Sequence, residues 1–100
     1  MAHLIMPYKN IRIGQVFFDI RKRDYYILAQ TGPKIISLIS LSDGNRFNDG
    51  FIVNDPFNIS IYEWNEISKD NNEDINFELV SNDTYFHYNE ITMRIEPDED

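Results

Sequence analysis

The sequence contains no cysteine, only four glycines and only two alanines among its 100 residues. The lack of cysteine excludes disulfide bonds and thiolate metal sites, and it is typical of proteins in a reducing compartment. So few glycines leave little scope for the glycine-rich loops that surround phosphates in nucleotide-binding folds. Because alanine has the highest helix propensity, its scarcity argues against a mainly helical protein.

Long apolar runs are missing as well. No stretch approaches the roughly 20 apolar residues of a membrane-spanning helix, and residues 1–7 lack the charged start and apolar centre of a signal peptide. We therefore expect a soluble cytoplasmic protein with no membrane association.

The residues that are abundant favour strands. Hydrophobic residues make up 42% of the chain and aromatic residues 14%, enough to build one core in a chain of this length. Aromatic and β-branched side chains fit pleated, half-buried surfaces. We expect one β-rich domain over residues 1–95, followed by an acidic tail over residues 96–100.

Turn signals divide this domain into short strands and one helix. Apolar or alternating segments predict strands at residues 14–18, 25–31, 35–41, 46–53, 75–79, 85–88 and 91–95. The fourth is interrupted around Gly50, by a bulge or a second turn, and the charged residues 21–24 predict a solvated turn after the first. Ser60 and Glu63 have the spacing of a capping box, and Ile59 and Trp64 that of a hydrophobic staple, which predicts a helix over residues 61–68. Alternation of Ile59 with Ile61 leaves a strand as the alternative.

These elements predict a mainly β fold. An SH3-like barrel is the first expectation, and an OB-like barrel or a bent antiparallel sheet with one short helix is the alternative. The segment 35–41 is apolar on both alternating faces, so it belongs either in the middle of a sheet or at the interface of a homo-oligomer.

Charge is distributed unevenly along the chain. Residues 1–58 contain seven basic and five acidic residues, a balance of +2, whereas residues 59–100 contain two and twelve, a balance of −10. An acidic surface repels phosphates, so we expect no direct binding of nucleic acid.

No catalytic or metal-binding constellation is evident. Of the two histidines, His3 lies near the N-terminus, and His87 has no obvious serine or aspartate partner. Residues 70–74 briefly resemble a calcium loop, but Ile75 and Ser81 stand where glycine and the bidentate glutamate belong. We predict a protein that is not an enzyme and that uses no cofactor or metal.

Two candidate binding sites remain. The first is the turn carrying Asn45, Arg46, Phe47 and Asn48, where a guanidinium, an aromatic ring and two amides are suited to a small anionic ligand such as a nucleotide. The alternative interpretation of these residues is an ordinary hairpin turn.

The second candidate is the acidic half of the chain. Asp70, Glu73, Asp74 and Glu78 could occupy a basic site on a protein partner or mimic the phosphates of DNA. Here too an ordinary interpretation exists, namely a solvated acidic surface.

The segments Tyr26 to Pro33 (YILAQTGP) and Leu38 to Phe47 (LISLSDGNRF) resemble small uncharacterised proteins encoded by tailed bacteriophages. The resemblance covers residues 12–68, and Phe47 replaces the tryptophan of those proteins. It implies an accessory role in the host cytoplasm: sequestering a nucleotide-derived signal in counter-defence or blocking a host nucleic-acid-binding protein. A virion or assembly component is the third hypothesis.

Overall fold

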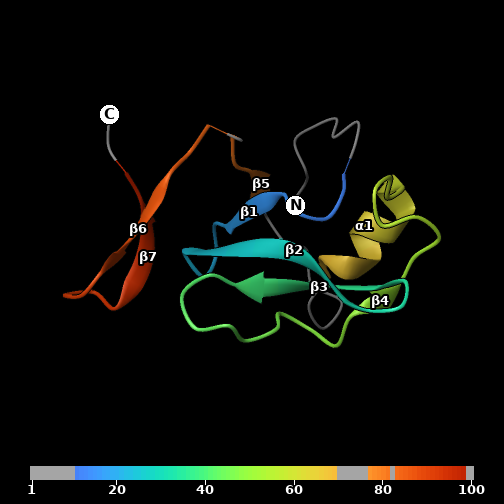
Figure 1. Cartoon of the computed structure of the whole chain (residues 1–100), viewed down its shortest axis with the longest axis horizontal. Coiled ribbons are helices and arrows are strands. Elements are labelled where there is room, and N and C mark those ends of the chain that lie inside the picture. The colour runs from blue at the N-terminus through green and yellow to red at the C-terminus, as the bar shows by residue number, and fades with distance from the viewer. Residues whose placement is uncertain (1–10, 70–76, 82, 99–100) are drawn as a thin grey trace.

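The computed structural model describes residues 11–69, 77–81 and 83–98. Seven strands and one helix follow in the order β1 (Val16–Asp19), β2 (Asp24–Gly32), β3 (Ile35–Ser40), β4 (Phe51–Ile52), α1 (Ile61–Ile67), β5 (Phe77–Leu79), β6 (Phe86–Asn89) and β7 (Arg94–Pro97). Figure 1 shows the β6–β7 hairpin on one side of the main sheet and α1 on the opposite side.

Five strands form one antiparallel sheet in the order β4-β3-β2-β1-β5, and β6 pairs with β7 in a separate hairpin. The prediction of a mainly β fold with one short helix is therefore confirmed. The predicted barrel is not found. In the described part of the chain, β4 and β5 are the two edges of the sheet and do not pair with each other, so the sheet stays open.

The core lies between one face of this sheet and α1. Trp64 and Ile67 of the helix are buried, as their spacing predicts. The Trp64 ring lies 4.4 Å from the Phe17 ring of β1 and 5.9 Å from the Phe77 ring of β5. One helical residue thereby joins two neighbouring strands, which explains how so short a helix stays attached.

The helix begins as the sequence predicts. The Ser60 hydroxyl accepts a hydrogen bond from the Glu63 amide (3.1 Å), and the Glu63 carboxylate accepts one from the Ser60 amide (2.9 Å). These reciprocal bonds satisfy two amides at the helix start. They also lower the pKa of the Glu63 carboxyl below its usual value, because the Ser60 amide favours the charged form.

Gly50 allows the segment before β4 to approach β3 closely. Its φ is +94°, and a Cβ there would lie 2.8 Å from the Ser37 hydroxyl and 3.3 Å from the Ile36 carbonyl oxygen. Any side chain would force these strands apart, and the conformation itself favours glycine. The predicted interruption around this residue is confirmed, and it leaves β4 only two residues long.

An aspartate fixes the turn between β1 and β2. The buried Asp19 carboxylate accepts hydrogen bonds from the amides of Arg21 (2.9 Å) and Lys22 (3.2 Å). The backbone carbonyl of Asp19 accepts another from the Arg23 amide (2.7 Å). Arg23 takes a left-handed conformation (φ 56°) to close the turn. Residues 21–23 therefore form an exposed turn, as predicted, whereas Asp24 already belongs to β2.

The β6–β7 hairpin repeats this design with a neutral side chain. The Asn89 amide oxygen accepts from the amides of Ile91 (2.8 Å) and Thr92 (3.3 Å), and Met93 takes the left-handed position (φ 60°). The alternation predicted for residues 91–95 is wrong in its first half, because Ile91 and Met93 lie in the turn and are exposed. β7 extends through Pro97 into the predicted tail.

Replacing Ser60 by alanine should lower the free energy of unfolding by about 0.5–2 kcal/mol, the usual cost of losing a helix N-cap. Asn65→Ala, which changes an exposed residue of the same helix, is the control and should be neutral or slightly stabilising. Equal losses in both variants, measured by urea unfolding, would contradict the capping role.

The core residue Tyr26 makes the free energy of unfolding depend on pH in the alkaline range. Burial, followed by the nearby carboxylates of Asp24 and Asp19, raises its pKa from 10.0 to about 12. A raised pKa means that the folded protein favours the neutral phenol. The stability gained in this way is fully present below pH 10 and is lost between pH 10 and 12. Tyr26→Phe should therefore show a shallower loss of unfolding free energy above pH 10, and identical pH profiles would refute this.

Candidate functional site

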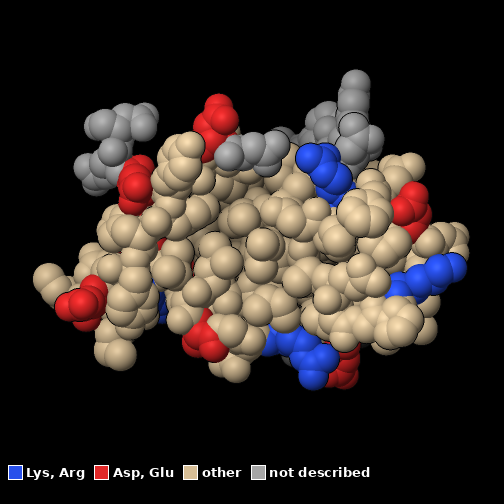
Figure 2. Space-filling model, in the orientation of Figure 1, with Lys and Arg blue, Asp and Glu red and all other residues tan. Residues whose placement is uncertain are grey.

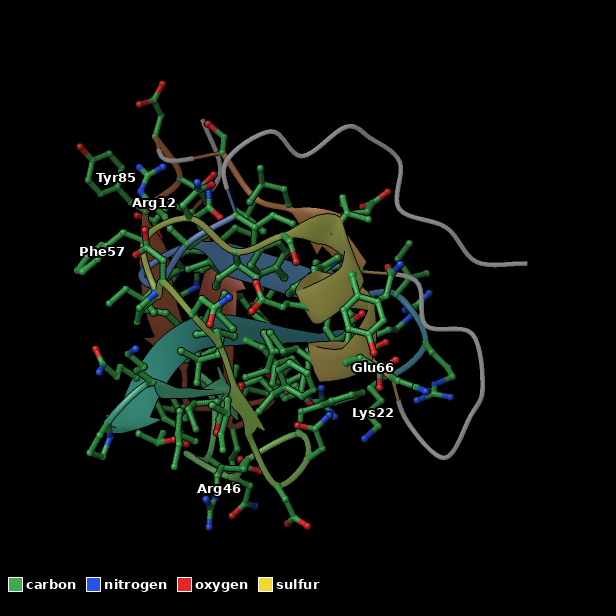
Figure 3. All side chains as sticks on the ribbon, turned by 90° about the vertical axis from the view of Figure 1, so that its right-hand side faces the viewer. Arg12, Lys22, Arg46, Phe57, Glu66 and Tyr85 are labelled. Carbon is green, nitrogen blue, oxygen red and sulfur yellow. The ribbon has the colours of Figure 1, made fainter. Side chains whose placement is uncertain are left out.

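The four residues of the predicted anion site have different environments. Asn45 and Arg46 are exposed, and in Figure 3 Arg46 extends outward at the lower edge of the molecule. Phe47 packs against the core instead, with its ring 5.6 Å from that of Tyr26 and 5.3 Å from that of Phe77. The aromatic ring of the proposed site is thus occupied by structural contacts.

Asn48 also has a structural role. Its side-chain amide donates hydrogen bonds to the carbonyls of Ile67 (2.7 Å) and Lys69 (3.2 Å), which lie at the C-terminal end of α1. Carbonyls in the last turn of a helix have no partner within the helix, so Asn48 supplies the missing donors. The structure therefore brings Asn45 and Arg46 to the surface but directs Phe47 and Asn48 toward the core and helix.

Of the four acidic residues predicted to bind a protein partner, the structure describes only Glu78. Asp70, Glu73 and Asp74 lie outside the described residues. Glu78 is exposed in the edge strand β5, directly opposite Phe18 of β1. Its carboxylate makes no hydrogen bond or ion pair with another described residue.

Glu78 is the first member of a row across the outer face of the sheet. Phe18 pairs with Glu78 on one side and with Tyr25 of β2 on the other, so all three side chains lie on the same face. The Phe18 and Tyr25 rings are 4.8 Å apart, and the Phe86 ring of β6 lies 5.2 Å from that of Tyr25. We call Glu78, Phe18, Tyr25 and Phe86 the outer row.

A hollow of about 410 Å³ opens beside the outer row. Its lining includes Phe18, Tyr25, Glu78, Leu79, Thr84 and Pro97. We call this space the Tyr25 hollow. Burial, followed by the charges of Glu78 and Glu96, raises the pKa of the Tyr25 hydroxyl. The carboxylates of Glu78 and Glu96 raise this pKa because their negative charge disfavours the phenolate form of Tyr25.

The β6–β7 hairpin bounds this hollow, and the part of the chain from β5 to Asp98 combines negative charge with exposed apolar side chains. Residues 77–98 contain five carboxylates and one basic side chain, Arg94, a balance of −4. Four large apolar side chains of this region are exposed by 49–92%, namely Tyr85, Tyr88, Ile91 and Met93. In Figure 2 acidic atoms mark the hairpin end, and most of the visible Lys and Arg atoms lie over the other half of this face.

Polar side chains hold the hairpin in one geometry. The His87 ring nitrogen Nδ1 lies 2.7 Å from a carboxylate oxygen of Asp98, and Glu96 receives hydrogen bonds from Asn89 and Thr92 (each 3.0 Å). The bonds from Asn89 and then Thr92 lower the pKa of the Glu96 carboxyl, so this group stays charged near neutral pH. These bonds position the carboxylates of Glu96 and Asp98 on the hairpin.

The hairpin is joined to the sheet by a few specific contacts. The Arg94 guanidinium donates to the Arg23 carbonyl (3.1 Å), and the Ile95 amide donates to the Ser42 hydroxyl (3.0 Å). Ser42 in turn donates to the Asp24 carboxylate (3.1 Å). These bonds fix the hairpin over the start of β2, beside Tyr25.

In the described ranges, no three His, Asp or Glu side chains come together as metal ligands. No helix in those ranges has the length and apolar character needed to cross a membrane. Comparison of the chain with protein-family models, curated proteins and solved structures found no match. The resemblance to phage proteins therefore remains an expectation, and function has to be inferred from the residues themselves.

Exchanging Asn48 should affect stability far more than exchanging its neighbour Arg46. Asn48→Ala leaves two carbonyls at the end of α1 without this donor, so we expect a loss of about 1–3 kcal/mol in unfolding free energy. Arg46→Ala removes an exposed side chain and should change it by no more than about 0.5 kcal/mol. Denaturant unfolding of both variants measures this difference, and the opposite order would contradict these assignments.

Proposed function

We propose that this chain is a non-catalytic protein-binding module whose acidic β6–β7 hairpin binds a basic surface of a partner protein. The observation that carries the proposal is that residues 83–98, the β6–β7 hairpin with its flanking residues, combine four carboxylates and one arginine with exposed Tyr85, Tyr88, Ile91 and Met93. Interfaces are enriched in tyrosine and methionine, and charge around such residues determines which partner approaches.

The position of the apolar residues supports this interpretation. Ile91 is 92% exposed and Met93 69% exposed in the β6–β7 turn, where they contribute little to the folded chain. An isolated apolar side chain on a surface is common, but two at the tip of a braced hairpin form a shape that a shallow pocket can accept. The carboxylates behind the tip would then meet basic residues around that pocket.

The chemistry of the surface also indicates the class of partner. A protein with a formal net charge of −8 is repelled by nucleic acid, but it is attracted to the basic groove of a nucleic-acid-binding protein. The resemblance to phage proteins directs the proposal to such a protein of the host cytoplasm. Occupation of that groove would prevent the partner from binding its nucleic acid.

This function predicts binding that depends on charge and on salt. Asp83→Asn with Glu90→Gln neutralises two exposed carboxylates that make no side-chain bonds to described residues. Binding to a partner isolated by affinity capture and then purified should weaken by about 2- to 30-fold at low salt, as expected for two exposed ion pairs. The difference should shrink as salt is raised.

The matched control is Asp49→Asn with Glu66→Gln, which gives the same change in net charge on other elements. It should bind like the wild type, and Ile91→Ser should weaken binding at every salt concentration. An affinity that does not change with salt and is the same in the Asp83 and Glu90 variant would refute the proposal. So would a partner whose nucleic acid binds equally well in the presence of this chain.

The capture of a small anionic ligand remains a second candidate, because Arg46 and Asn45 are exposed side by side. Among the described residues Arg46 has no ion-pair partner, so its guanidinium is free to bind a phosphate. Without the ring of Phe47 and the amide of Asn48, however, this site would recognise charge rather than a base. It would bind nucleotides and inorganic phosphate with similar affinity.

A further inference from the structure

The Tyr25 hollow has the two features that a cationic side chain requires. The first is a pair of aromatic rings, because Phe18 and Tyr25 line the hollow with ring centres 4.8 Å apart, and the Phe86 ring packs edge-on against Tyr25 at 5.2 Å. The second is negative charge, because Glu78 stands opposite Phe18 at one end of the outer row. Aromatic faces attract cations through their quadrupole, and a nearby carboxylate adds a direct attraction.

Glu78 is the one charged side chain among the described residues that line the hollow. None of the described residues that line it is a lysine, arginine or histidine. Glu78 makes no side-chain bond within the described part of the chain, so its carboxylate oxygens are available to an outside donor. After burial, the charges of Glu78 and then Glu96 raise the pKa of the Tyr25 hydroxyl, and of these two carboxylates Glu96 also lies 4.0 Å from the His87 ring.

We infer that the Tyr25 hollow binds the side chain of an arginine on the partner protein, with the guanidinium stacked on Tyr25 and paired with Glu78. The inference rests on the proposed function, because it names the basic group that one part of the acidic surface receives. The hairpin tip and the hollow then act as two separate contact points on one partner.

Arginine fits this geometry better than lysine does. A guanidinium is planar and weakly hydrated, so it stacks on an aromatic ring while its N–H groups reach a carboxylate in the same plane. A lysine ammonium keeps its hydration more firmly and has no flat face to lay on Tyr25. An anionic ligand is disfavoured by both Glu78 and Glu96.

The test uses three capped tripeptides, Gly-Arg-Gly, Gly-Lys-Gly and Gly-citrulline-Gly, titrated into ¹⁵N-labelled full-length chain. Citrulline has the shape of arginine without its charge. We expect the arginine peptide to shift the resonances of Phe18, Tyr25, Leu79 and Thr84, the lysine peptide to bind more weakly and the citrulline peptide not to bind. Equal binding of arginine and citrulline peptides would overturn the inference.

Variants assign the contact to the outer row. Tyr25→Leu and Glu78→Gln should each weaken binding of the arginine peptide by about 2- to 30-fold, the range expected for losing a cation–π contact or a paired charge. Tyr25→Phe keeps the ring and should keep the affinity, which separates stacking from a general disturbance of the fold. Glu66→Gln on α1 is the charge-matched control and should bind like the wild type.

Failure of this inference can be told from failure of the proposed function. If Tyr25→Leu retains its native spectrum and binds both peptide and purified partner like the wild type, the hollow is not an arginine site, although the hairpin proposal stands. If the arginine peptide binds as expected but changes at Asp83, Glu90 and Ile91 leave binding of the partner unchanged, the arginine site stands and the hairpin proposal fails.

Discussion

The register between β1 and β2 is the constraint on which the rest of the structure depends. Asp19 closes the turn and thereby pairs Phe17 with Tyr26 and Phe18 with Tyr25. Because side chains alternate across a strand, a slip of one residue would exchange the two faces. The turn therefore decides which aromatic rings enter the core and which form the outer row.

Both faces of this pair of strands are then used. On the inner face Phe17 packs with Trp64, which ties the single helix to the sheet. On the outer face Tyr25 contacts Phe86, which ties the acidic hairpin to the same strand. The Tyr25 hollow thus lies on the reverse side of the core, and the same register positions both. Contacts that are formed before binding lower the entropic cost of binding a partner.

Local signals in the sequence predicted local structure well. The capping box at Ser60, the glycine break at Gly50 and the tight turns were all readable, because each depends on residues a few positions apart. The role of Asn48 was not readable, since it donates to carbonyls 19 and 21 residues away. The outer row was hidden for the same reason: adjacent aromatic pairs indicate rings on both faces, but only the register shows which side chains meet.

Ring-to-ring nuclear Overhauser effects measure this register most directly in solution. One register for both faces predicts contacts of Phe18 with Tyr25 and of Tyr25 with Phe86, and separate contacts of Phe17 with Trp64. A strong contact between the rings of Phe17 and Tyr25 would place them on one face. That result would contradict both the core and the binding surface described for this protein.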